Sequence, residues 1–129
     1  MSATLLNSTY QEAMRLIVEV RDYMAVNQAL IAREPDPDRR FAWIQESLLM
    51  TTRLAQVMAW ALVRRAVHAD EMTAEEADAE PHRLGARELC LAQDDGQLER
   101  LPPYMRSLAE RSRALYARVA RLDDLLGAA

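Results

Sequence analysis

The sequence contains no lysine, so its 16 basic residues are all arginine. They are outnumbered by 20 acidic residues, which gives a formal net charge of −4. A surplus of negative charge disfavours general electrostatic binding to nucleic acid, and no nucleic-acid partner is expected. Because Cys90 is the only cysteine, an intrachain disulfide and every zinc site that needs several thiolates are excluded.

Long hydrophobic runs are also missing. The longest, Val57–Val63, is far shorter than the ~20 apolar residues that a membrane-spanning helix requires. The first residues, Met1–Leu6, have no basic region ahead of an apolar stretch, which a secretory signal would have. We therefore expect a cytoplasmic protein that does not associate with membranes.

Turn-forming residues are scarce, with 3 glycines and 5 prolines among 129 residues, while 50% of the sequence is hydrophobic. Abundant Ala, Leu, Arg and Glu with so few chain breakers are typical of helices, and the length suits one domain. The predicted fold is all-α, an antiparallel bundle of three long helices with one short extra helix, in a single domain over residues 1–129. The predicted helices span residues 8–32, 38–68, 73–80 and 102–126.

Local signals support these boundaries. Ser8 with Gln11, and Thr73 with Glu76, have the spacing of a capping box at a helix start. The turn Glu34–Pro37 ends the first helix. An almost unbroken seven-residue apolar pattern runs along the last helix. Its members are Leu101, Met105, Leu108, Leu115, Val119, Leu122 and Leu126.

The second predicted helix carries two apolar seams and is expected to pack between two neighbours. The first seam consists of Phe41, Ile44, Leu48, Ala55, Met58 and Leu62. The second seam consists of Trp43, Met50, Leu54, Val57 and Ala61. Three apolar residues outside both seams, Leu49, Trp60 and Val67, lie among Glu46, Arg53, Gln56 and Arg64, on what should be the solvent side.

This strip of Leu49, Trp60 and Val67 has two interpretations. A tryptophan flanked by aliphatic side chains on a polar surface is typical of an interface core, which would serve a homodimer or a partner. Alternatively, the short helix or residues 85–100 cover the strip. On the first interpretation, the partner interface comprises Leu49, Trp60, Val67, Arg53 and Arg64.

The last helix is basic on the side opposite its leucine stripe, with Glu110 as the single acidic residue among its arginines. A solvated face is the ordinary interpretation of such a pattern, and a docking face for an acidic partner is the other. On the second interpretation, Arg106 and Arg113 make secondary contacts with the partner.

No cofactor and no metal site are expected. His68 and His82 lack the Glu-x-x-His spacing of carboxylate-bridged metal sites, and no histidine lies near Cys90 to activate its thiol. Arg64 and His68 share one helix face, so a HEPN-like ribonuclease is the enzymatic alternative. In the HEPN ribonucleases, however, the arginine and the histidine are spaced further apart than these two residues. The main prediction is a protein without enzymatic activity.

Several segments resemble the RcdA family, the regulators of CtrA degradation. The similarity extends over nearly the whole chain, and the stretch in the second helix is long enough to be specific. The segments are Tyr10–Met14, Arg21–Tyr23, Glu46–Leu54, Gln56–Trp60, Arg65–His68, Gly85–Leu89 and Arg113–Leu122.

The resemblance implies a small helical homodimer of alphaproteobacteria that acts as an adaptor. Members of the family dock on the ClpXP protease primed by the response regulator CpdR, and they deliver transcription factors or further adaptors during the cell cycle. We expect ClpXP with a CpdR-like regulator, and transcription-factor or adaptor cargo, as the partners here. A helical dimer of unrelated binding function is the alternative.

The end of the chain departs from the family pattern. Members that deliver cargo carry a flexible extension after the last helix, whereas this chain stops at Ala129. A tether raises the effective concentration of cargo at the protease, so its absence is expected to affect delivery rather than cargo binding. Ala128 and Ala129 also resemble the small apolar ends of ClpX substrates, which would make them a degradation signal.

Overall fold

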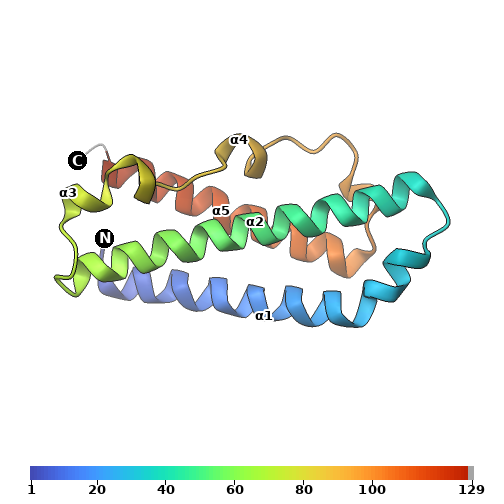
Figure 1. Cartoon of the computed structure of the whole chain (residues 1–129), viewed down its shortest axis with the longest axis horizontal. Coiled ribbons are helices and arrows are strands. Elements are labelled where there is room, and N and C mark those ends of the chain that lie inside the picture. The colour runs from blue at the N-terminus through green and yellow to red at the C-terminus, as the bar shows by residue number, and fades with distance from the viewer. Residues whose placement is uncertain (128–129) are drawn as a thin grey trace.

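The computed structural model describes residues 1–127 and folds them into a bundle of three long helices, which confirms the all-α class. These helices are α1 (Ala3–Arg33), α2 (Pro37–His68) and α5 (Pro103–Gly127), and they lie side by side in Figure 1. No helix within the described residues is long and apolar enough to cross a membrane. The predicted degradation signal, residues 128–129, lies outside the described residues.

Residues 69–102, here called the connector, join α2 to α5. In Figure 1 the connector runs back along the bundle, so α2 and α5 point in the same direction and α1 runs against both. The connector contains α3 (Ala74–Ala77), α4 (Arg87–Cys90) and two 3₁₀ turns, Glu80–His82 and Leu98–Arg100. The bundle is therefore antiparallel at both contacts of α1 and parallel between α2 and α5.

The predicted boundaries of the long helices are close to those observed, except at the start of α1. The predicted start at Ser8 is wrong, because Ser2 caps the helix through a hydrogen bond from the Leu5 N–H to its Oγ at 3.1 Å. The capping box of α3 is confirmed. Thr73 Oγ1 accepts a bond from the Glu76 N–H at 3.1 Å, and Glu76 Oε1 accepts one from the Thr73 N–H at 3.2 Å.

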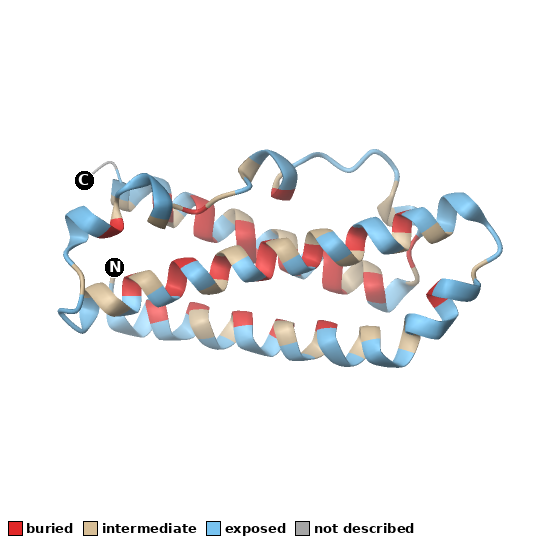
Figure 2. Cartoon of the chain, viewed as in Figure 1, coloured by how far each residue is buried: buried red, intermediate tan, exposed pale blue. Residues whose placement is uncertain are grey.

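The core lies between the three long helices, where buried positions face inward in Figure 2. The seven-residue pattern predicted for the last helix is confirmed by this core. Leu122 and Leu126 are half-buried against it. The fully buried members of the pattern are Leu101, Met105, Leu108, Leu115 and Val119.

The orientation of α2 differs from the prediction. The second seam is confirmed, because its buried members are Met50, Leu54, Val57 and Ala61. The first seam is wrong, because its exposed members are Phe41, Ile44, Leu48, Ala55 and Leu62. The helix buries the opposite, charged side instead, where connector and α5 groups form hydrogen bonds with the charged side chains. Burying a charge is tolerable when such partners are present.

Ion pairs between α1 and α5 use part of the basic surface of α5. The Glu19 carboxylate accepts hydrogen bonds from Arg111 at 2.8 Å and from the Tyr104 hydroxyl at 2.9 Å. The bond from Arg111 lowers the pKa of Glu19. Glu12 forms a second pair with Arg118. These arginines of α5 therefore bind acids of the same molecule.

Trp60 allows a direct test of this core. Its side chain is buried, and its indole Nε1 donates a hydrogen bond to Asp123 Oδ1 at 3.1 Å. Trp60→Phe keeps an aromatic ring but removes this donor from a buried carboxylate. We expect the free energy of unfolding to fall by ~1–3 kcal/mol, measured by urea unfolding.

The matched control is Trp43→Phe on the same helix. Trp43 is only half-buried, and its Nε1 donates to the Arg100 carbonyl at 2.7 Å, where water can replace it. We expect a smaller loss for this variant. Equal losses in the two variants would contradict the placement of Trp60 in the core.

Candidate interaction surfaces

The strip predicted on α2 lies under the connector, so the covered interpretation is the one that the structure supports. Trp60, Arg53 and Arg64 are 1%, 4% and 6% exposed. Arg64 Nη2 donates to Asp78 Oδ1 of the connector at 2.9 Å, and Arg53 Nε donates to the Cys90 carbonyl at 3.3 Å. The prediction that these three residues form an open partner interface is therefore wrong, because the connector shields them from solvent.

The buried side chain of Asp123 on α5 binds arginines of the connector and so holds the connector against the bundle. This side chain is fully buried, and its Oδ2 accepts hydrogen bonds from Arg83 Nε at 2.9 Å and Arg87 Nη2 at 2.6 Å. Trp60 donates to its other oxygen, Oδ1. Burial raises the pKa of Asp123, but the bonds from Arg83 and Trp60 outweigh burial, and the net pKa is lowered. Asp123 therefore remains ionised at neutral pH.

A second buried ion pair lies within α2, and its arginine also forms hydrogen bonds with α5 and the connector. Arg53 Nη1 donates to Glu46 Oε1 at 2.7 Å, and their side chains are 5% and 7% exposed. The same nitrogen lies 3.3 Å from the Ser112 hydroxyl of α5. One guanidinium group thus holds an acid of its own helix, a hydroxyl of α5 and, through Cys90, a connector carbonyl.

The predicted secondary contacts also act within the molecule. Arg106 Nε donates to the Leu98 carbonyl at 2.9 Å, and Arg113 Nη2 donates to the Leu91 carbonyl at 2.9 Å. Both arginines are half-buried and hold the connector against α5. Val67, near the end of α2, is half-buried as well.

The buried nucleophiles are held in their neutral forms. Burial raises the pKa of the Cys90 thiol, and it raises the pKa of the Tyr116 hydroxyl to about 12. A thiol without a lowered pKa is a poor nucleophile at neutral pH. The arginine of the ribonuclease alternative, Arg64, is buried and bound to Asp78, so it cannot face a substrate together with His68. No group of three or more potential metal ligands occurs in residues 1–127.

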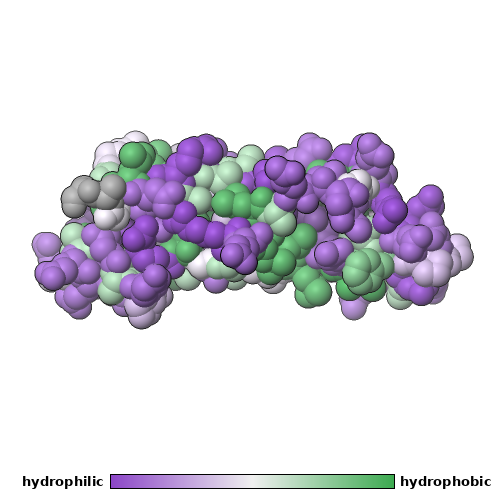
Figure 3. Space-filling model, turned by 90° about the horizontal axis from the view of Figure 1, so that it is seen from above, coloured by the Kyte–Doolittle hydropathy of each residue, from purple (hydrophilic) through white to green (hydrophobic). Residues whose placement is uncertain are grey.

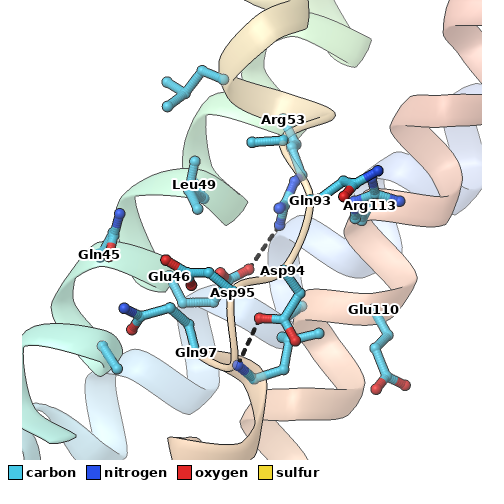
Figure 4. Close-up of a pocket in the computed structure, with 15 residues that line it drawn as sticks. Gln45, Glu46, Leu49, Arg53, Gln93, Asp94, Asp95, Gln97, Glu110 and Arg113 are labelled. Atoms are coloured by element: carbon cyan, nitrogen blue, oxygen red, sulfur yellow. Dashed lines mark hydrogen bonds and ion pairs between the residues drawn. The ribbon is translucent and has the colours of Figure 1, made fainter.

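Leu49, the remaining residue of the strip, lines a pocket of about 200 Å³ between α2, the connector and α5. We call it the connector pocket, and Figure 4 shows it with the Glu46–Arg53 pair at its base. Figure 3, which looks onto the connector, shows hydrophobic side chains gathered in the middle of this side of the molecule. The residues lining the pocket include Leu49, Leu89, Asp95, Gln97, Glu110 and Arg113.

The exposed side of α2 is a second candidate surface. Between Phe41 and Leu62, every exposed residue of this helix is uncharged, although Glu46 and Arg53 lie in the same stretch as buried residues. An exposed helix face without charges is unusual for surface in contact with water and is typical of an interface. We call it the α2 face, and its residues are Phe41, Ile44, Gln45, Leu48, Thr51, Ala55, Ala59 and Leu62.

Comparison with known proteins places the chain in a family. The family model described as "Protein of unknown function (DUF1465)" matches residues 1–129. This chain belongs to the DUF1465 family. A solved structure of RcdA from Caulobacter crescentus CB15 is similar, with 31% sequence identity and a TM-score of 0.75. The match covers 100% of this chain and 95% of that chain, which confirms the resemblance to RcdA, while the search of curated proteins found no match.

Sequence reasoning missed the α2 face of this DUF1465 protein and, of the connector pocket, named only Leu49, Arg53 and Arg113 as partner contacts. It assigned the α2 face to the core because large apolar residues at helical spacing ordinarily face inward. The available signal was the spacing of Glu46, Arg53 and Arg64, which share one side of α2 and could find buried partners together. The pocket left no local signal, since its walls come from three separate parts of the chain.

The role of Asp123 in this DUF1465 protein is testable by Asp123→Asn. The variant keeps the side-chain shape but removes the charge that Arg83 and Arg87 bind. We expect a loss of about 3 kcal/mol at pH 7, the low end for a broken buried pair, because both arginines are partly exposed.

The stability difference between this variant and the wild type should depend on pH. The folded pKa of Asp123 is lowered, so its stabilisation is present above the unfolded pKa of about 4 and is lost as pH falls through the folded value. Urea unfolding should therefore show a smaller difference between the variant and the wild type at pH 3 than at pH 7. Asp124→Asn, at an exposed neighbour that also pairs with Arg87, is the control and should change stability little.

Proposed function

We propose that this DUF1465 protein is a non-enzymatic cytoplasmic adaptor that binds cargo proteins and promotes their degradation by the ClpXP protease. The observation that carries the proposal is the similarity to RcdA along the whole chain at 31% identity. The proposed partners are ClpXP with a CpdR-like response regulator, and the proposed cargo is a transcription factor or another adaptor of the cell cycle. The buried charges fit this role, because they hold the connector in place instead of facing a substrate.

A reconstituted degradation assay tests the adaptor function. Purified ClpX, ClpP, a CpdR-like regulator and CtrA from an alphaproteobacterium are mixed with and without this protein, and CtrA loss is followed on gels. We expect CtrA to disappear several times faster when the protein and the regulator are both present.

Reactions without the regulator are the control and should show the basal rate. Unchanged CtrA loss in the complete mixture, together with no binding of CtrA or ClpX to the immobilised protein, would contradict the proposal. It would favour a helical protein whose partners are unrelated to proteolysis.

The proposed adaptor is a homodimer that associates through the α2 face. The exposure of its large side chains supports this role, since Phe41 is 61% and Leu48 is 66% exposed. Monomeric proteins rarely leave a contiguous apolar stripe of this kind in water. The occupant we assign to the face is a second copy of the same chain.

The spacing of the α2 face supports an isologous contact. If two copies of α2 cross antiparallel about a two-fold axis between Thr51 and Thr52, Leu48 meets Ala55 of the second copy. Ile44 then meets Ala59 of the second copy. Near the axis, large residues thus oppose small ones, and at each end of the contact Phe41 meets Leu62 of the second copy.

Leu48→Glu tests the dimer. It places a carboxylate on each side of the proposed contact, and each would lose water without gaining a partner. We expect the dimer dissociation constant to rise at least about tenfold, measured by sedimentation equilibrium, with unchanged helix content.

Leu125→Glu is the matched control, because Leu125 lies on α5 and is 69% exposed, close to the 66% of Leu48. This variant should dimerise like the wild type. A wild-type protein that is monomeric at micromolar concentration, or a Leu48→Glu variant that dimerises normally, would refute the assignment of the α2 face.

A further inference from the structure

The connector pocket is sized for one side chain. Its volume of about 200 Å³ exceeds the ~150 Å³ cavity that admits a benzene-sized group. It is smaller than the ~300–1,000 Å³ of ordinary small-molecule sites. The walls come from α2, the connector and α5, which the hydrogen bonds of Arg53 to Cys90 and Ser112 hold together. The pocket is therefore built on fixed elements and is open to solvent on one side.

The two arginines of the pocket form different numbers of contacts within the molecule. Arg53 at its base donates to Glu46, Ser112 and the Cys90 carbonyl. Arg113 donates to the Leu91 carbonyl. Arg53 is therefore committed to acceptors of the same molecule, whereas Arg113 forms one hydrogen bond to a neutral carbonyl.

Several oxygen atoms of the pocket can still accept a hydrogen bond or pair with a cation. Gln97 Oε1 is a buried oxygen that has no hydrogen-bond partner among the described residues. Glu46, which is 5% exposed, uses Oε1 for Arg53, and its second oxygen accepts no hydrogen bond within residues 1–127. Asp95 and Glu110 on the rim form no ion pair within the same residues. In Figure 4, Glu46, Asp95 and Gln97 project from α2 and the connector into the same region.

The walls above these acceptors are apolar. Leu49 of α2, Leu89 of α4, Leu98 and Ala109 line the pocket, and Leu89 is 53% exposed at its edge. These apolar walls suit the aliphatic part of a long basic side chain, whose charged end would reach the acceptors at the base of the pocket. Charge balance agrees, because Glu46, Asp94, Asp95 and Glu110 outnumber the two arginines that line the pocket.

We propose that the connector pocket binds an arginine or lysine side chain of a partner protein. This inference rests on the proposed adaptor function, which makes the partner a protein. The pocket adds which kind of side chain that protein presents. An apolar residue flanking the basic one would lie on the exposed Leu89 at the edge of the pocket. Among the residues of the α2 face, the pocket uses only Gln45.

A peptide titration tests this pocket without protease or cargo. The probe is the acetylated and amidated pentapeptide Ala-Leu-Arg-Leu-Ala, and its binding is followed in ¹H–¹⁵N NMR spectra of the full chain. We expect saturable shifts of the Gln97 side-chain amide and of the backbone amides of Leu49, Leu89 and Ala109. The same peptide with norleucine in place of arginine should bind several times more weakly.

Two variants place the binding in the pocket. Glu110→Arg reverses an exposed rim charge, and we expect it to weaken binding about three- to tenfold without affecting the fold. Leu49→Trp fills the pocket and should abolish the shifts. Glu75→Arg, the same charge change at an exposed residue of α3, is the matched control and should bind like the wild type. If Leu49→Trp fails to fold, the comparison of Glu110→Arg with Glu75→Arg still shows whether the peptide binds in the pocket.

Three results would overturn the proposal. Equal binding of the norleucine peptide would make the pocket a purely apolar site. Equal weakening by Glu75→Arg would mean general attraction to an acidic protein. Equal affinity for free arginine would assign the pocket to a small molecule. Because the titration uses no protease, its failure leaves the adaptor proposal intact, and failure of the degradation assay leaves the titration result intact.

Discussion

The buried carboxylate of Asp123 is the interaction on which the arrangement of the connector depends. It binds Trp60 of α2 and Arg83 and Arg87 of the connector while it is itself part of α5. A carboxylate removed from water must have such donors, since an uncompensated buried charge costs several kcal/mol. The requirement fixes three parts of the chain against one another at one end of the bundle.

The covered side of α2 follows from this constraint. Once the connector lies on the bundle, Glu46, Arg53 and Arg64 find partners within the molecule, and their side of the helix becomes interior. The apolar side is then turned outward. The interface-like composition of the α2 face is thus the counterpart of an unusually polar interior, and both come from one rotation of the helix.

The sequence predicted what is local. The long helices, the capping box at Thr73 and the buried pattern of α5 depend on residues close together in the chain, and these predictions hold. The rotation of α2 depends on contacts between distant residues, such as Arg53 with Ser112 and Trp60 with Asp123. Periodicity shows that a helix has two apolar stripes and a polar one, but it does not show which polar residues meet distant partners. The connector pocket lies beyond sequence reasoning for the same reason.

The parallel direction of α2 and α5 has an electrostatic consequence. Two helices that point the same way place the negative ends of their macrodipoles together, and only α1 opposes them. Arg64, Arg83 and Arg87 gather at that end, and Arg83 Nη2 also lies 3.4 Å from the Asp123 carbonyl in the closing turns of α5. Although residues 70–80 of the connector are acidic, the connector therefore also places two arginines, Arg83 and Arg87, beside the closing turns of α5, where the helix dipoles add.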